Sequence, residues 1–127
     1  MKVPFEINLK DKVAVVTGGG GILCAMFARA LAANGAKVAI LDLNKDAADK
    51  VADEINKEGG TAISVAANVL EIESLKAAKK VVNDAFGKCD ILLNGAGGNN
   101  PRGTTTKDYL LPEDIENSEI ATFYDLD

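Results

Sequence analysis

Short apolar runs alternate with longer amphipathic segments along most of the chain. The apolar runs lie at about Lys12–Thr17, Lys37–Asp42, Thr61–Ala66 and Asp90–Leu93. Their interiors are rich in Val, Ile, Leu and Ala, which is typical of strands buried on both faces of a parallel sheet. The intervening segments, about 22–34, 45–58 and 71–86, repeat apolar residues at helical spacing. The pattern therefore predicts β-α-β-α-β-α-β.

The spacing also predicts which face of each helix is buried. Glycines or Asn-Gly pairs follow all three segments, as expected at helix ends. Asn44 is placed to cap the second helix. The expected buried stripes are Leu23, Met26, Phe27, Ala30 and Leu31 in the first helix, Ala47, Ala48, Val51, Ala52 and Ile55 in the second, and Leu75, Ala78, Val82 and Phe86 in the third.

This alternation predicts an α/β fold with a Rossmann-type, doubly wound parallel sheet. The expected strand order is 3-2-1-4, and the sheet stops after the fourth strand. Both glycine-rich turns, Gly18–Gly21 and Gly95–Gly98, then follow adjacent strands and border one crevice. We expect residues 1–127 to form a single domain, in which 99–127 are a polar loop and an acidic C-terminal segment.

The first glycine turn has the features of a phosphate cradle. Gly18–Gly21 lie between a buried strand and an amphipathic helix, so the backbone can approach a ligand and the helix offers free N–H groups to it. The fit to G-x-G-x-x-G is incomplete: Gly18 and Gly20 match, but Leu23 stands at the third position, or Cys24 in the shifted frame. A purely structural turn is the alternative.

An acidic residue narrows the choice of possible ligands. Asp42 ends the second apolar run, 24 residues after Gly18, where a carboxylate can accept both hydroxyls of an adenosine ribose. It would repel a 2′-phosphate, and Leu43 and Asn44 follow it rather than an arginine. NAD is therefore favoured over NADP. A solvated strand-end charge or a helix cap is the alternative interpretation of Asp42.

Three further polar residues are weaker candidates. The Asn68 amide can pair with an adenine edge, although an ordinary loop asparagine fits equally well. The Thr17 hydroxyl can hold the glycine turn, or Thr17 is simply a β-branched strand end. Arg102 can bind a substrate carboxylate bidentately, or it is a surface arginine.

Composition excludes several classes of function. A net charge of −5 disfavours nucleic acid and anionic membranes as partners. No apolar run approaches the roughly 20 residues of a membrane span, and the N-terminus lacks a signal-peptide core, so we expect a cytoplasmic protein. The absence of histidine excludes Ser-His-Asp hydrolysis and His-bearing zinc sites, and we expect no metal. Cys24 and Cys89 are expected to be reduced, half-buried residues.

Together these motifs resemble those of the short-chain dehydrogenase/reductase family over about residues 8–98. Thr17-Gly18-Gly19-Gly20-Gly21-Ile22 resembles its Thr-Gly-x-x-x-Gly-x-Gly turn, Asp42 its NAD-selecting acid, Asn68-Val69 its adenine-contacting Asp-Val, and Asn94-Gly95-Ala96-Gly97 its Asn-Asn-Ala-Gly. The resemblance implies that NAD is bound by Thr17, Gly18, Gly20, Gly21, Ile22, Asp42, Asn68, Val69, Asn94, Gly95, Ala96 and Gly97.

The chain departs from the family pattern in each turn. Without a gap, the second and third glycines of the family's turn fall on Ile22 and Cys24, whereas a shift of one residue makes Gly21 the second. Asn68 replaces an Asp and keeps an acceptor without its charge. Gly95 replaces the second Asn and loses a side-chain hydrogen bond.

The family's catalytic Ser and Tyr-x-x-x-Lys have no match. Tyr109 is followed by Leu110, Leu111, Pro112 and Glu113, and no lysine follows Tyr124. We therefore name no catalytic residue and expect this chain to be the cofactor-binding half of an enzyme, inactive by itself. The fourth strand should leave an open apolar sheet edge, so marginal stability or a homo-oligomer is expected.

Within the family, the glycine run, the Gly97–Pro101 loop and the ending Phe123–Asp127 look most like bacterial D-mannonate oxidoreductases of the fructuronate reductase type. This implies hydride transfer between a nicotinamide and the carbonyl or secondary alcohol of a small-molecule substrate. Two alternatives remain open: an S-adenosylmethionine-dependent methyltransferase and a non-catalytic nucleotide-binding module. A kinase-like phosphate loop is excluded, because no Gly-Lys-Ser/Thr follows the glycines.

Overall fold

The computed structural model describes residues 7–98 and 103–125 of the chain. It contains every strand and helix expected from the hydrophobic pattern, each boundary lying within one residue of its expected position. The elements are β1 (Val13–Thr17), α1 (Ile22–Ala33), β2 (Lys37–Asp42), α2 (Lys45–Lys57), β3 (Thr61–Ala66), α3 (Ile72–Phe86), β4 (Ile91–Asn94) and two short 3-10 turns, η2 (Pro112–Asp114) and η3 (Phe123–Asp125). Residues 1–96 and 97–127 form two compact units.

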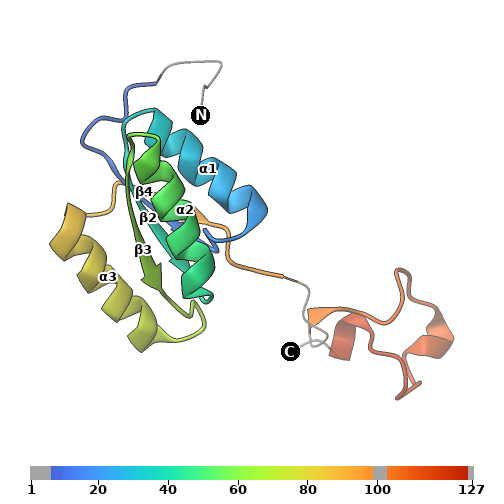
Figure 1. Ribbon diagram of the computed structural model, residues 1–127. Coiled ribbons are helices and arrows are strands. Elements are labelled where there is room, and N and C mark those ends of the chain that lie inside the picture. Colours follow the sequence, from blue (N-terminus) through green and yellow to red (C-terminus); the bar gives the residue numbers. More distant parts are fainter. Residues whose placement is uncertain (1–6, 99–102, 126–127) are drawn as a thin grey trace. The chain divides into compact units, whose positions relative to one another are not determined.

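The four strands of the first unit form one parallel sheet, and its order is β3-β2-β1-β4 (Figure 1). The predicted α/β fold and strand order are confirmed. In the register, Thr17 of β1 pairs with Leu41 of β2 and with Asn94 of β4, and Asp42 pairs with Ala66 of β3. The last residues of all four strands therefore lie along one edge of the sheet, where the predicted ligand residues are.

Helices cover both faces of this sheet. Figure 1 shows α1 and α2 on one face and α3 on the other. One buried cluster joins α1 and α2 to Val16, Val38 and Ile40, which are the largest fully buried side chains. A second cluster joins Val15 and Leu41 to α3. Alternate strand residues thus face opposite layers, which explains why the apolar runs carry no internal charge.

The predicted buried face of α1 is wrong at three of its five residues, while Ala30 and Leu31 are half-buried and Leu31 packs against the core. Leu23, Met26 and Phe27 are 69%, 49% and 48% exposed. The buried residues of α1 are instead small. These buried residues are Cys24, Ala25, Ala28 and Ala32.

The other two helices bury the faces that the pattern predicts. In α2 the buried residues are Ala48, Val51, Ala52 and Ile55, while Ala47 is half-buried. In α3, Ala78 and Val82 are buried and Leu75 and Phe86 are half-buried. These helices lie on the sheet through ordinary aliphatic side chains, so apolar periodicity identifies the face correctly.

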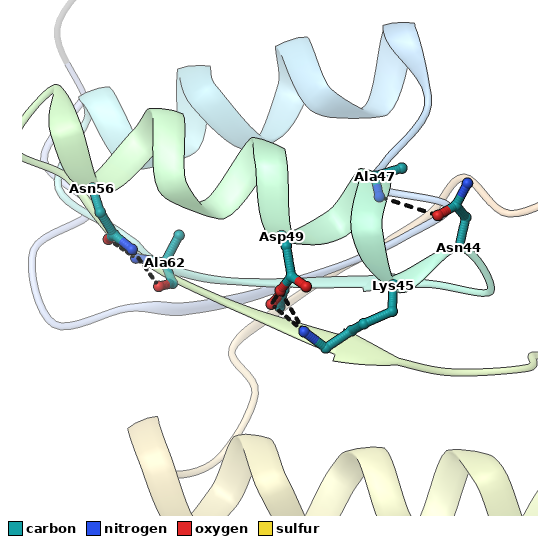
Figure 2. Close-up of polar contacts among 7 residues, drawn as sticks. Asn44, Lys45, Ala47, Asp49, Asn56 and Ala62 are labelled. Atoms are coloured by element: carbon teal, nitrogen blue, oxygen red, sulfur yellow. Dashed lines mark hydrogen bonds and ion pairs between the residues drawn. The ribbon is translucent and has the colours of Figure 1, made fainter.

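Polar contacts join α2 to the outer strand β3 (Figure 2). Asn44 caps the helix by accepting a hydrogen bond from the Ala47 N–H at 3.1 Å, as predicted. Lys45 pairs with Asp49, which also accepts a hydrogen bond from Ser64 of β3. The Asn56 side-chain amide accepts the Ala62 N–H at 2.8 Å and donates to the Ala62 carbonyl at 2.9 Å. It thus pairs with both backbone groups of Ala62, as a neighbouring strand would.

At the other side of the sheet, Asp90 ties the start of β4 to β1. Its carboxylate accepts the Val13 N–H at 2.9 Å and lies 3.6 Å from the Lys12 ammonium. The hydrogen bond from the Val13 backbone, followed by the charge of Lys12, holds the pKa of Asp90 below its usual value. Among the described residues no strand lies beyond β4, and Leu92 is 58% exposed.

The second unit is held mainly by polar contacts. Asp114 is buried, and its carboxylate accepts hydrogen bonds from the Lys107 ammonium at 2.6 Å and from the Leu111 N–H at 3.0 Å. Thr106 and Ala121 form a reciprocal pair of hydrogen bonds, both 2.9 Å long. These contacts fold residues 103–125 into a small loop structure with two 3-10 turns.

Candidate functional site

The glycine turn after β1 needs glycine at three successive positions. Gly18 has a φ of +65°, and a β-carbon there would lie 2.8 Å from the Gly95 carbonyl oxygen. A β-carbon at Gly19 would lie 2.7 Å from the Ile40 side chain. At Gly20 it would lie 2.8 Å from the β-carbon of Ala47. The turn is therefore packed against β2, α2 and the turn after β4 without room for side chains.

The first turn of α1 leaves backbone donors available. Gly21 is the N-cap, and no side chain caps the helix. Gly21 itself donates to the Gly18 carbonyl at 3.0 Å, and the Ala25 N–H donates to the Gly21 carbonyl at 2.8 Å. In the described part of the chain, the N–H groups of residues 22–24 have no acceptor. These donors and the positive end of the helix dipole suit an anionic group such as a diphosphate.

Thr17 joins the two glycine-rich turns. Its hydroxyl accepts hydrogen bonds from the Gly95 N–H at 3.1 Å and from the Ala96 N–H at 3.2 Å. Thr17 is buried, so this oxygen is fixed by the end of β1. Thr17 is therefore more than a β-branched strand end: its hydroxyl holds the turn that follows β4. The two turns thus form one continuous surface at the ends of β1 and β4.

Asp42, the last residue of β2, is hydrogen-bonded to the first of these turns. One carboxylate oxygen accepts the Gly20 N–H at 2.9 Å, and the other accepts the Asn44 N–H at 2.9 Å. A β-carbon at Gly20 would lie 3.0 Å from the first of these oxygens, so glycine permits the contact. Within the described ranges Asp42 forms no ion pair. Its negative charge remains available to a ligand's hydroxyl groups and would repel a phosphate.

Asn68 follows β3, and its side chain is engaged locally. The amide oxygen accepts the Leu70 N–H at 3.1 Å, and the amide nitrogen donates to Glu71 at 2.9 Å. The Asn68 N–H donates to the Ser74 hydroxyl at 2.9 Å. This arrangement starts α3 in the manner of an Asx turn. Neighbouring Val69 is 38% exposed and offers an apolar surface beside the strand ends.

An apolar groove of about 650 Å³ runs from the strand ends along the α3 face of the sheet. The sequence pattern does not predict this groove, because its lining residues come from separate strands and a helix. The residues that line it are Val15, Thr17, Leu41, Val69, Leu75, Lys79, Val82, Asn83, Lys88, Cys89, Leu92 and Asn94.

The other sequence candidates lie in the second unit or outside the described residues. Gly97 is the first residue of the second unit. Arg102 lies outside the described residues. Tyr109 and Tyr124 are 67% and 72% exposed. In residues 7–98 and 103–125, no group of three or more Cys, Asp or Glu side chains is arranged to hold a metal ion, and no helix is long and apolar enough to cross a bilayer.

Comparisons with known proteins agree with this geometry. The family model for short chain dehydrogenases matches residues 12–118. An uncharacterized oxidoreductase of Haemophilus influenzae is 47% identical over the whole of this chain, which spans 44% of that relative's length. This chain therefore spans less than half of that curated relative.

Solved structures show the same fold. One is named as a D-mannonate oxidoreductase of Haemophilus and has bound NAD; it is 48% identical, with a TM-score of 0.77 over 94% of this chain and 42% of that chain. A metagenomic short-chain oxidoreductase in complex with NADP is 35% identical, with a TM-score of 0.66 over 70% of this chain and 40% of that chain. Both neighbours carry a nicotinamide cofactor.

Proposed function

Since the chain belongs to the short-chain dehydrogenase family, we propose that it binds NAD as the cofactor of an oxidoreductase. The observation that carries this proposal is the joined pair of turns, with Asp42 bonded to Gly20 beside free N–H groups of α1. The family membership favours this function over the methyltransferase alternative. When bound, the cofactor supplies hydride transfer between its nicotinamide and a carbonyl or secondary alcohol.

The residues that would hold NAD follow the strand ends. Gly18–Gly21 and the N–H groups of Ile22 and its neighbours take the diphosphate, since the N–H groups of residues 22–24 have no acceptor in the described part of the chain. Asp42 takes the adenosine ribose. Asn68 and Val69 border the adenine, which requires the exposed Glu71 to release the Asn68 amide. Asn94, Gly95 and Ala96 take the ribose on the β4 side.

We propose NAD rather than NADP as the cofactor because of Asp42. Its carboxylate has no cationic partner in the described residues, so a 2′-phosphate would meet an unneutralised negative charge. Two ribose hydroxyls would instead donate charge-assisted hydrogen bonds to it. The bound NAD of the Haemophilus neighbour is consistent with this preference.

Titration with NADH and NADPH tests the proposal. We expect the wild-type protein to bind NADH more tightly than NADPH. Asp42→Ala should weaken NADH binding by about 10–100-fold, because a hydrogen bond to a charged group contributes ~1.5–3 kcal/mol. Discrimination against NADPH should fall in the same variant. Asp46→Ala is the matched control, since Asp46 lies in the first turn of α2 and carries the same charge.

Two results would contradict the proposal. Equal affinities for NADH and NADPH in the wild type would remove the argument from Asp42. Unchanged NADH binding in Asp42→Ala would remove Asp42 from the site. Melting temperatures of both variants should be measured in parallel, because Asp42 also bonds Gly20 and a global loss of structure must be separated from a loss of ribose contacts.

We propose a sugar acid of the D-mannonate or fructuronate type as the substrate, on the name of the Haemophilus neighbour. The assay is the appearance of NADH when the full-length protein is given NAD and D-mannonate. Residues 1–127 alone should bind cofactor without turnover, because Leu110 to Glu113 after Tyr109 do not provide the lysine of Tyr-x-x-x-Lys. Turnover by a sample with the mass of this chain would contradict that expectation.

A further inference from the structure

We propose that Cys24 and Gly95 form an interlocking pair that positions the turn after β4, which makes Cys24 a positioning residue of the cofactor site. The inference rests on the proposed function, because the turn concerned is the one assigned to the β4-side ribose. Cys24 comes from the buried face of α1, and Gly95 follows the last residue of β4. Their contact joins two segments 71 residues apart in the sequence.

The thiol of Cys24 occupies the space that a side chain at position 95 would need. A β-carbon built on Gly95 would lie 2.2 Å from the Cys24 sulfur, the shortest such approach among the glycines of the structure. The backbone itself does not require glycine here, because the glycines with positive φ are at positions 18, 35, 59 and 87. Glycine at 95 is therefore required by its neighbours, above all by the Cys24 sulfur and secondarily by the Thr17 carbonyl at 3.0 Å, and not by the conformation of the turn.

The same thiol also holds the turn by a polar contact. The Cys24 S–H donates to the Gly95 carbonyl oxygen at 3.7 Å. A β-carbon on Gly18 would come within 2.8 Å of that oxygen from another direction. Thr17 fixes the other side of the peptide by accepting the Gly95 N–H at 3.1 Å. The Gly95 peptide is thus enclosed by the end of β1, by the glycine turn and by α1.

This enclosure brings together Gly95, where the family pattern has asparagine, and Cys24, which replaces a family glycine when the first turn is aligned without a gap. The two residues are far apart in the sequence. Where the family has asparagine at position 95, a β-carbon would overlap the Cys24 sulfur. With glycine at 95, the sulfur fills the space and supplies a donor to the carbonyl. The two residues compensate for each other, so a change at either one should move the turn and change cofactor affinity.

A double-mutant cycle tests this pair in the full-length protein. The variants are Gly95→Ala, Cys24→Ala and the double variant, each titrated with NADH. Gly95→Ala should weaken NADH binding by about tenfold, and Cys24→Ala by less, as expected for one side of a contacting pair. The double variant should recover most of the loss, but not all of it, because the Thr17 carbonyl would still lie 3.0 Å from the new β-carbon.

Matched controls use positions without these contacts. Gly103→Ala adds a β-carbon that would meet no atom within 4 Å at a position outside the glycine-rich turns, and Cys89→Ala removes the exposed cysteine. Both should bind NADH as the wild type does. Simple addition of the two single effects in the double variant would overturn the proposal, as would wild-type affinity in Gly95→Ala.

A measurement on the wild type keeps the test valid if Gly95→Ala fails to fold. Iodoacetamide labelling, followed residue by residue by mass spectrometry, should slow at Cys24 when NADH fixes the turn, while exposed Cys89 keeps its rate. Equal rates at Cys24 with and without NADH would refute a positioning role. A wild type that binds neither NADH nor NADPH would refute the proposed function instead. Melting temperatures of the same three variants and the wild type would then show separately whether Cys24 and Gly95 are coupled.

Discussion

Gly18→Ala tests whether the two glycine-rich turns are packed against each other as the structure shows. The substitution adds one methyl group at a residue whose φ is +65°. It would place the β-carbon 2.8 Å from the Gly95 oxygen and 2.9 Å from both the nitrogen and the α-carbon of Ala96. All these neighbours are backbone atoms, so no side chain can rotate away to make room.

The expected loss of folding stability in Gly18→Ala has two parts. A non-glycine residue in the left-handed region costs ~1–2 kcal/mol. Forcing an extra methyl group against fixed atoms costs a further ~1–3 kcal/mol. The free energy of unfolding should therefore fall by ~2–5 kcal/mol, which corresponds to a melting temperature lower by at least about 8 °C for a unit of this size. NADH affinity should fall as well, because the turn must move.

Urea unfolding followed by circular dichroism measures the stability change, and Gly59→Ala separates its two parts. Gly59 has a φ of +87°, but a β-carbon there would meet no atom within 4 Å. That variant carries the conformational cost without the steric one. If Gly18→Ala is no more destabilising than Gly59→Ala, the close approach of the two turns is wrong, and the argument for a shared crevice between β1 and β4 fails with it.

Three further changes test other contacts. Thr17→Val removes the acceptor of two N–H groups and should lower stability by ~1–3 kcal/mol and weaken NADH binding, whereas Thr17→Ser should retain both in the same assays. Asn56→Ala leaves the backbone of Ala62 unpaired at the outer strand and should increase aggregation measured by light scattering. The Val13 N–H lowers the pKa of Asp90, so the stability contributed by its ionised form is present above the unfolded pKa and is lost as pH falls through the lower, folded pKa. Asp90→Asn should remove that part of the acid-dependent loss of stability, measured by urea unfolding at a series of pH values from about 5 downwards.

The regular elements of the fold were predictable because their signals are local. Strand runs and helix stripes differ in period, and the residues that end the helices, such as Gly35 and Gly87, adopt the expected left-handed conformation. The inward face of α1 was not predictable from apolar periodicity. There the buried positions hold small residues, while the larger apolar residues Leu23, Met26 and Phe27 are exposed. The repeated small residues at 24, 25, 28 and 32 were the signal that could have identified that face.

The candidate site was predictable in its position but not in its internal bonds. Parallel topology places Thr17, Asp42 and Asn94 at one edge of the sheet, and the sequence suffices for that conclusion. The bonds from Thr17 to residues 95 and 96 join segments 78 and 79 positions apart, and no local pattern encodes them. The local bonding of Asn68 is likewise not evident from the sequence, because its spacing to Glu71 and Ser74 is compatible both with an ordinary loop asparagine and with a ligand contact.

The bonds of Asp42 limit how the cofactor preference of this protein can be redesigned. A common strategy replaces the acidic residue after the second strand with a small or basic one, so that a 2′-phosphate is accepted. Here that residue also receives the Gly20 N–H at 2.9 Å, within the turn that would hold the diphosphate. Such a replacement would alter the recognition of the ribose and the shape of the phosphate turn at once. A successful redesign must therefore introduce a second acceptor for Gly20 together with the new residue at position 42.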